Sequence, residues 1–597
     1  MPVGPPELIC GRHRTARQAV DSGPHRPAKA AGSKLEEEGR TRPVEATPGV
    51  GQTGALQAGG TTGAPAGPAG PAGPAGPWAP LAVPVYRALW IAVLVSNIGT
   101  WMQTVGAQWL LVDEPNASTL VALVQTASTL PVVALALPAG VLADSFDRRR
   151  LLLAVQGFQV AVGAVLTALT AAGQMRPALL LTLTFALGAG AAVTAPAYQA
   201  LIPELVPRAQ ITSAAALGSI SVNLARAVGP AVAGLLISHV GVAAVFGLNA
   251  LTFAVFAAVL LGWRRAPDDP RDREPFAFAL RAGGRYVRHS PVVRRLLLRV
   301  VLFVVPAMAV WALLPLVATR RLDMGASGYG VLLGALGVGA VGGAFLLPRA
   351  RARLSANALV AGASCLYAAA MAVVVAGDVL PLVLLALLPA GAGWIGVLST
   401  MNASLQLFLP GWVRARGLAV YQIVLFGGQA VGAFGWGLVA EHLGLRAAYL
   451  AAAAAMALGA ASVLVWPLRE THGLDRSPAV FWPEPELAFE PAPDDGPVLV
   501  TRLYTIAEQD EEEFLLAMER VRRATQRTGA VRWQVYRDGA DPRRFLEAYL
   551  VPSWGEHLRQ HEGRLTGSDQ AAEERAHALS DPPPVASHLF PAGHRPH

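Results

Sequence analysis

The feature that most constrains this chain is a series of about twelve apolar runs, each close to the ~20 residues that a helix needs to cross a bilayer. Six runs lie near residues 88–112, 118–142, 151–172, 177–199, 212–238 and 241–263. Six more lie near 296–319, 326–348, 354–376, 379–404, 413–440 and 444–468. We therefore predict an all-α membrane protein with about twelve transmembrane helices in two six-helix halves, 85–263 and 296–468.

Polar segments divide the rest of the chain. Residues 1–80 are rich in Gly, Pro and Ala and cannot bury enough apolar surface to become ordered, so we predict a disordered cytoplasmic extension. Changes in composition set the other boundaries: a cytoplasmic central linker at 264–295, a linker rich in Pro and acidic residues at 469–497, a small domain at 498–580 and a disordered tail at 581–597.

Composition and charge exclude several classes of protein. Hydrophobic residues make up 53% of the 597 residues and charged ones 15%, whereas soluble domains have about 45–50% and about 25%. The formal charge of +8 could indicate nucleic acid, but the arginines gather at the ends of apolar runs, so we expect no nucleic-acid partner. Two cysteines, Cys10 and Cys365, do not suffice for a disulfide framework or a metal cluster.

The loop charges predict the orientation. Basic residues gather after the second and eighth runs, in the central linker and before the eleventh run: Arg148, Arg149, Arg150, Arg349, Arg351, Arg353, Arg414 and Arg416. These loops alternate along the chain, and the positive-inside rule assigns them to the cytoplasm together with both termini. The preference for Arg over Lys, with abundant Ala, Gly and Pro, is typical of GC-rich bacteria. We therefore expect a multi-pass protein of a bacterial inner membrane.

Residues 498–580 alternate between strand and helix patterns. Three stretches have the β-branched and aromatic residues of strands: 498–506, 531–536 and 545–551. Between the first two, Phe514, Met518, Val521 and Thr525 share one helix face. A second helix carries His557 and His561. This βαββα order predicts a small α+β domain of the ferredoxin-like class.

Signs of enzymatic chemistry are weak. His557 and His561 are spaced i, i+4 and could bind one metal, but no third ligand has a suitable spacing, which favours a surface helix without metal. The sequence has no catalytic triad, no nucleophile signature and no phosphate-binding G-x-x-x-x-G-K-[ST] motif. We expect no catalytic residues, no cofactor and no direct use of ATP.

A short loop between the second and third runs concentrates small and charged residues. Residues 138–150 read P-A-G-V-L-A-D-S-F-D-R-R-R. Gly140 would allow two helices to approach closely. Asp144 can pair with Arg148, with Arg149 or with the positive N-terminus of a nearby helix.

The fifth run carries a basic residue at membrane depth. Residues 223–235 read N-L-A-R-A-V-G-P-A-V-A-G-L, and the residues of interest are Asn223, Arg226, Gly229, Pro230 and Gly234. Small residues thin one helix face, and Pro230 removes a backbone hydrogen bond and permits a bend. An unpaired Arg226 would be costly there. It could contact an anionic or polar substrate, pair across the two halves, extend its side chain toward the membrane surface (snorkelling), or bind backbone carbonyls.

Polar side chains follow one face of the first run at spacings of 4, 3 and 4: Asn97, Trp101, Thr104 and Gln108. Others lie at membrane depth in later runs, among them Gln125, Tyr198, Gln422 and Gln429, together with Trp394, Asn402 and Trp436. Single residues of this kind usually bond between helices, whereas the stripe as a whole indicates the wall of a substrate cavity. No Asp or Glu lies in the middle of a run, so a proton relay has no obvious carrier.

These motifs resemble the major facilitator superfamily. Gly140, Asp144, Arg148 and Arg149 match its loop pattern G-x-x-x-D-x-x-G-R-R/K, although Ser145 and Asp147 depart from it. Span five is similar to the exporter-associated pattern G-x-x-x-G-P-x-x-G-G. In that superfamily the loop locks the halves on the cytoplasmic side, which would make these four residues part of a cytoplasmic gate. The alternative is that the arginines only anchor the topology.

Further segments narrow the resemblance to the enterobactin-exporter-like branch, the transmembrane secretion effectors. They are F-D-R-R-R, A-P-A-Y-Q-A-L-I-P-E-L-V-P, N-L-A-R-A-V-G-P and, near the C-terminus, G-A-V-R-W-Q-V-Y-R-D and S-W-G-E-H-L-R-Q-H. The C-terminal domain is similar to dimeric ferredoxin-like domains of the antibiotic-biosynthesis-monooxygenase type. A homodimer formed through this domain is a further hypothesis.

The resemblance implies a secondary active transporter that works by alternating access. It would export a siderophore, a drug-like compound or another small organic molecule, with membrane lipid as its surroundings. Two alternatives use the helical bundle only as a scaffold: a membrane-tethered small oxygenase, and a sensor or interaction protein.

Overall fold

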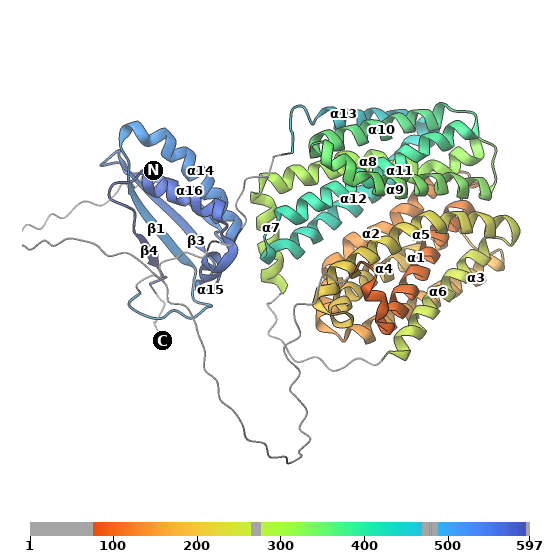
Figure 1. Cartoon of the computed structure of the whole chain (residues 1–597), viewed down its shortest axis with the longest axis horizontal. Coiled ribbons are helices and arrows are strands. Elements are labelled where there is room, and N and C mark those ends of the chain that lie inside the picture. Colours follow the sequence, from red (N-terminus) through yellow and green to blue (C-terminus); the bar gives the residue numbers. More distant parts are fainter. Residues whose placement is uncertain (1–75, 264–275, 469–476, 478, 480–486, 593–597) are drawn as a thin grey trace, which may run out of the picture. The chain divides into compact units, whose positions relative to one another are not determined.

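The computed structural model describes residues 76–263, 276–468, 477, 479 and 487–592 (Figure 1). Nearly all of the predicted N-terminal extension, parts of both linkers and the last five residues lie outside the described residues. Helices dominate as far as residue 461, and the strands that the structure describes all follow residue 497.

Six helices form the first half of the membrane bundle. They are α1 (Pro84–Leu110), α2 (Ala117–Ser145), α3 (Arg148–Ala171), α4 (Pro177–Leu205), α5 (Ile211–His239) and α6 (Val242–Gly262). Two short 3₁₀ turns, η1 (Ala79–Ala82) and η2 (Arg208–Gln210), precede α1 and α5. Proline starts α1 and α4, where its lack of an N–H costs nothing because the first N–H groups of a helix have no partner within the helix. The Asp147 side chain caps α3 by accepting a hydrogen bond from Arg150 N.

The second half follows an additional helix, α7 (Phe276–His289), which lies in the predicted central linker. Its helices are α8 (Pro291–Arg320), α9 (Ala326–Arg353), α10 (Ala356–Ala376), α11 (Leu380–Phe408), α12 (Gly411–Leu443) and α13 (Leu445–Ala461). In Figure 1 the red-to-yellow helices α1 to α6 group together, and so do the green-to-cyan helices α8 to α13. The predicted two-half helical fold is confirmed.

Eleven helices among the described residues are long and apolar enough to cross a membrane. The twelfth, α13, has 17 residues and is shorter than the predicted run 444–468. Its C-terminal carbonyls are bound by the buried Arg299 of α8, which donates to Gly459 O (2.9 Å), Ser462 O (2.8 Å) and Trp466 O (2.6 Å). These bonds satisfy the carbonyls at the end of a helix, and Pro467 follows directly.

The two halves pack through small residues. A Cβ atom added to Gly437 of α12 would lie 2.5 Å from Ala122 Cβ of α2, and one added to Gly234 of α5 would lie 2.8 Å from Ala326 O of α9. Further along the same pair of helices, a Cβ on Gly337 would lie 2.7 Å from Ala227 Cα. Glycine therefore allows α2 to approach α12, and α5 to approach α9, at backbone distance.

These contacts gather at one end of the bundle. Ala326 begins α9 and Gly437 lies near the end of α12, both at the end opposite the loop that holds Arg148. Four hydrogen bonds between the halves also lie between this end and the middle: Gln108 to Trp311 O, Tyr329 to Gln108, Thr126 to Ala430 O and Arg320 to Ser118.

The C-terminal domain has a βαββαβ order. Its elements are β1 (Val498–Thr505), η3 (Glu508–Asp510), α14 (Glu511–Thr528), β2 (Arg532–Arg537), β3 (Arg544–Val551), α15 (Trp554–Arg559), the π-type turn η4 (Gln560–Arg564), α16 (Gly567–Ala578) and β4 (Ala586–Leu589). The four strands form one antiparallel sheet in the order β2-β3-β1-β4. Phe514, Met518 and Val521 of α14 are buried, as the helical spacing predicts.

The fourth strand corrects a prediction. β4 lies in residues 581–597, which the sequence analysis assigns to a disordered tail, and it pairs with β1 from Leu499–Leu589 to Arg502–Ala586. Its four residues, A-S-H-L, lack the β-branched and aromatic residues that mark a strand. The strand forms because β1 offers a free edge, and that edge exists only after the sheet has assembled.

Candidate functional site

Arg226 lies in the middle of α5, about 20 Å along the axis from either end of the helix. Its Nη1 donates to Asn223 Oδ1 at 3.4 Å, a long hydrogen bond to the preceding helical turn. Its Nε is buried and has no hydrogen-bond partner. Arg299, by contrast, has its guanidinium bound to three carbonyls and to the Ser462 hydroxyl. Arg226 is therefore a membrane-depth cation with little compensation from the protein.

Two tryptophan rings flank the guanidinium. Its Cζ lies 5.5 Å from the Trp101 ring of α1 and 5.9 Å from the Trp311 ring of α8. The two rings lie 5.6 Å apart, and Trp394 of α11 lies 5.3 Å from Trp311. Cation–π contacts of this kind contribute about 0.5–2 kcal/mol, depending on desolvation. They bring residues of both halves, α1 and α5 on one side and α8 and α11 on the other, to one place.

The small residues of span five explain how this cluster can form. A Cβ on Gly229 would lie 2.6 Å from Trp101 Cβ and 3.0 Å from Ile98 O. Only glycine therefore lets α1 come close enough to hold Trp101 against Arg226, one turn away. Pro230 is buried, and its carbonyl oxygen would lie 2.8 Å from a Cβ on Gly330 of α9. Gly229, Pro230 and Gly234 thus thin the face of α5, as the sequence predicts.

A hydrogen-bonded bridge lies beside the cluster. The buried Gln108 of α1 donates from Nε2 to Trp311 O at 3.3 Å and accepts from the Tyr329 hydroxyl of α9 at 2.5 Å. Gln108, predicted as part of a cavity wall, instead joins the two halves. An unsatisfied buried amide costs about 1–3 kcal/mol, so this bridge stabilises the contact between the halves.

The other residues predicted to line a cavity differ in their contacts and in their exposure. Asn97 donates to Ser221 Oγ at 3.3 Å within the first half, and Thr104 bonds to Thr100 O of its own helix. Tyr198 is half-buried and packs edge-on against Phe256 at 6.3 Å, beside an apolar cluster of the first half, and its place in a cavity wall stays a prediction. Three side chains are half-buried or exposed: Gln125, Gln422 and Gln429.

Two arginines of the predicted gate loop, Arg148 and Arg149, contact residues of the first half. Arg148 forms an ion pair with Glu204 of α4 and donates to Ala200 O at 3.1 Å. Arg149 donates to the last carbonyls of α6, Leu260 O at 2.8 Å and Leu261 O at 3.0 Å. A Cβ on Gly140 would meet nothing within 4 Å, so the close approach predicted there is not made in this conformation. The side chain of Asp144 lies outside the described residues.

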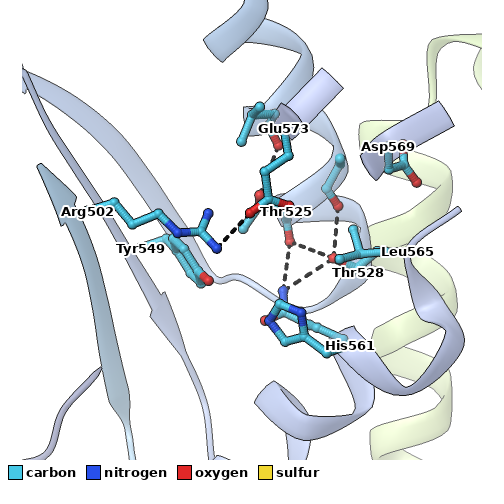
Figure 2. A pocket seen from close by; sticks show the side chains of 11 residues that line it. Arg502, Thr525, Thr528, Tyr549, His561, Leu565, Asp569 and Glu573 are labelled. Atoms are coloured by element: carbon cyan, nitrogen blue, oxygen red, sulfur yellow. Dashed lines mark hydrogen bonds and ion pairs between the residues drawn. The ribbon is translucent and has the colours of Figure 1, made fainter. Parts of the chain in front are cut away.

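The C-terminal domain holds a small, polar pocket. Figure 2 shows Arg502 and Tyr549 of the sheet facing Thr525 and Glu573 of the helices. Arg502 pairs with Glu573 at 2.6 Å and with the fully buried Glu547 at 3.5 Å. The cavity measures about 20 Å³, which leaves room for roughly one water molecule. These charges compensate one another, so the pocket is best explained as a structural network.

His557 and His561 take part in packing. His557 is fully buried, its Nδ1 lies 3.1 Å from Gln560 Oε1, and its Nε2 lies 3.0 Å from His588 Nε2 of β4. Burial lowers the pKa of His557 to about 4 and that of His561 to about 2. Both imidazoles are therefore neutral near pH 7. The described residues contain no group of three or more His, Cys, Asp or Glu side chains that could hold a metal.

Two residues of the site, Trp311 and Tyr329, are not marked by any pattern in the sequence. Trp311 lies in the apolar run P-A-M-A-V-W-A-L-L-P, where a single aromatic residue usually indicates ordinary packing. Its contact with Arg226 joins positions 85 residues apart in sequence, from two different halves. The only signal available was an aromatic residue at the same membrane depth as a charged one.

Fold and site together define a class: a multi-pass helical membrane protein with two halves that enclose a charged, aromatic cluster at their interface. A family model described as "Transmembrane secretion effector" matches residues 75–594. The chain belongs to this family of major facilitator superfamily transporters.

Curated relatives agree with this assignment. The staphyloferrin A transporter of Staphylococcus aureus (strain NCTC 8325 / PS 47) is 28% identical over 165 residues, 28% of this chain and 41% of that protein. The enterobactin exporter EntS of Shigella boydii serotype 4 (strain Sb227) is 30% identical over 263 residues, 44% and 62% of the two chains. The chain thus spans about half the length of these relatives.

A solved structure supports the fold alone. A bacterial homolog of the human lysosomal transporter Spinster, in an inward-facing and occupied conformation, is similar with a TM-score of 0.52 and 15% identity. The match covers 65% of this chain and 95% of that one.

Proposed function

We propose that this chain is a secondary active exporter that moves a siderophore, a drug-like compound or another small organic molecule across the bacterial inner membrane. Two relatives are named as a staphyloferrin A transporter and an enterobactin exporter, which supports a siderophore or a chemically similar cargo. We also propose that the direction of transport is export, that the protein lies in the inner membrane and that both of its termini face the cytoplasm.

The observation that carries the proposal is the position of the contacts between the halves. They lie from the middle of the bundle to the end opposite the arginine-rich loops, and the Arg226 cluster lies at their inner edge. With the arginine-rich end in the cytoplasm, this is a conformation closed toward the outside. Rocking of the halves about the cluster would then expose it alternately to the two sides.

The loop of Gly140, Asp144, Arg148 and Arg149 would act as the cytoplasmic gate. The space around Gly140 and the binding of Arg148 to Glu204 of its own half suit a gate in its open state. In the opposite conformation we expect this loop to contact the second half. Gln125, Gln422 and Gln429 remain proposed contacts of the substrate.

The C-terminal domain is proposed to be ferredoxin-like and to join two copies of the chain. Its βαββαβ order and sheet order β2-β3-β1-β4 support that fold. A cavity of about 20 Å³ gives little support to a tethered oxygenase, since an organic substrate needs several hundred cubic ångströms.

The test is the accumulation of siderophores and fluorescent drugs in efflux-deficient cells. Cells that contain the protein should accumulate less of at least one compound class. Asp144→Asn and Arg226→Ala should abolish the effect, whereas Arg353→Gln, an exposed arginine at the end of α9, should retain it. Equal accumulation with and without correctly inserted protein, for every compound, would contradict export.

A further inference from the structure

We propose that Arg226 and its tryptophans bind the anionic group of the substrate, and that the substrate is an organic anion in which a carboxylate or phenolate is attached to a planar aromatic ring. This inference rests on the proposed transport function and specifies its cargo.

The membrane helices offer Arg226 no acidic side chain at its own depth. Acidic residues occur in the twelve membrane helices only near helix ends, at Asp144, Glu204 and Glu441. Arg226 lies about 20 Å from the ends of its own helix, beyond the reach of a side chain at those levels. Its one hydrogen bond is the long contact with Asn223. A buried cation is normally paired, so the missing partner is the feature that the ligand must supply.

The side chains of the site present hydrogen-bond donors without free acceptors. A guanidinium carries five N–H donors, and here the buried Nε has no partner. The Nε1 of Trp394, which can only donate, is also buried without a partner. Two nearby side-chain acceptors are already used: Asn223 Oδ1 accepts from Arg226, and Gln108 Oε1 accepts from Tyr329. A donor-rich site with a fixed cation selects oxygen anions and disfavours cationic compounds.

The walls of the site are flat and aromatic. Trp101, Trp311 and Trp394 follow one another at centroid distances of 5.6 Å and 5.3 Å, with tilted planes. Phe303 of α8 extends the series, 6.0 Å from Trp394. Such spacings are those of favourable aromatic pairs, so a planar ring can pack against these indoles while its anionic group reaches Arg226.

The arrangement also connects binding to movement. Arg226 and Trp101 belong to the first half, and Trp311 and Trp394 to the second. An anion bound to Arg226 and to the Trp394 N–H would therefore bridge the halves. A ligand that interacts with both halves shifts the equilibrium between conformations by its differential affinity for them.

The test uses the full-length protein in lipid nanodiscs and isothermal titration calorimetry with three small probes. Benzoate carries both a carboxylate charge and a planar aromatic ring. Benzamide has the aromatic ring without the charge, and cyclohexanecarboxylate has the charge on a saturated, non-aromatic ring. We expect saturable benzoate binding, with both other probes at least about tenfold weaker, since a charge-assisted hydrogen bond and an aromatic contact are each lost.

Variants assign the binding to the cluster. Arg226→Gln should weaken benzoate binding at least about tenfold, and Arg226→Lys should give an intermediate affinity because it keeps the charge without the planar donors. Trp394→Phe keeps a ring but removes the N–H and should cost about three- to tenfold. Arg353→Gln is the matched control and should bind like the unmodified protein. Thermal unfolding confirms that each variant is folded.

The outcomes separate this inference from the proposed function. Equal binding of benzoate and benzamide, no binding of any probe, or wild-type affinity in folded Arg226→Lys and Trp394→Phe would overturn the anion site. Efflux of a neutral or cationic compound that survives in Arg226→Gln would also overturn it while leaving export intact. Benzoate binding that depends on Arg226, in a protein that exports no compound, would support the site and contradict export.

Discussion

Gly234→Ala should shift the equilibrium between the conformations of the bundle. The added Cβ would lie 2.8 Å from Ala326 O and 3.1 Å from Gly330 Cα, across the contact between α5 and α9. Favourable carbon contacts begin at about 3.5 Å, so the contact with Gly330 Cα alone would require the two helices to separate by about 0.4 Å. Both neighbours are backbone atoms and cannot rotate away.

The magnitude follows from the cost of overpacking. Adding a methyl group to a closely packed contact costs about 1–3 kcal/mol. This cost applies only where α5 and α9 touch, so it reduces the population of this conformation about 5- to 150-fold relative to one in which they are apart. Alanine also favours the helix by about 1 kcal/mol over glycine, but that gain is the same in both conformations and cancels.

Distances between spin labels would measure the shift. Labels at Gln174→Cys in the first half and Val379→Cys in the second report on the end where the halves meet, after Cys10 and Cys365 are replaced by Ser. Gly234→Ala should move the distance distribution to longer values. Gly218→Ala on the same helix is the matched control, because its Cβ would meet nothing within 4 Å. An unchanged distribution in Gly234→Ala, or the same change in both variants, would refute the reasoning.

Three further predictions concern other contacts. Tyr329→Phe removes a hydrogen bond to the buried Gln108 Oε1, and it should weaken the contact between the halves by about 1–3 kcal/mol. The same spin-label experiment should then give a longer distance. Tyr86→Phe is the control and should leave this distance unchanged, because the Tyr86 hydrogen bond lies within the first half. Arg148→Gln breaks an ion pair whose side chains are 21% and 22% exposed, so it should lower the free energy of unfolding by less than about 1 kcal/mol. A thermal-unfolding loss well above that value would contradict this assignment of a weak, partly exposed ion pair. The third prediction concerns pH. Burial lowers the pKa of His557 from 6.5 to about 4, so between these pH values the unfolded chain binds more protons than the folded one. The C-terminal domain should therefore lose stability as pH falls from 6.5 toward 4. His557→Gln should flatten this dependence, and an equally steep loss in that variant would exclude His557 as its source.

Much of the helical fold was predictable because each membrane helix is a local property. The bilayer requires about 20 apolar residues per span, and the runs beginning near 177 and 326 coincide with the starts of α4 and α9. The close packing of span five was also predictable, because small residues such as Gly229 and Gly234 in an apolar helix allow a neighbouring membrane helix to approach closely. In the C-terminal domain, β1 to β3 followed from their residue types, whereas β4 did not.

The sequence by itself determined the number and placement of most helices, the arginine-rich end of the bundle and the isolated charge at Arg226. These depend on residue type and on spacing within one segment. Only the tertiary structure decided what surrounds that charge: Trp101 from α1, Trp311 from α8 and the Gln108–Tyr329 bridge beside them. Such contacts arise when separate helices pack, and no local pattern records which side chain of one half meets which side chain of the other.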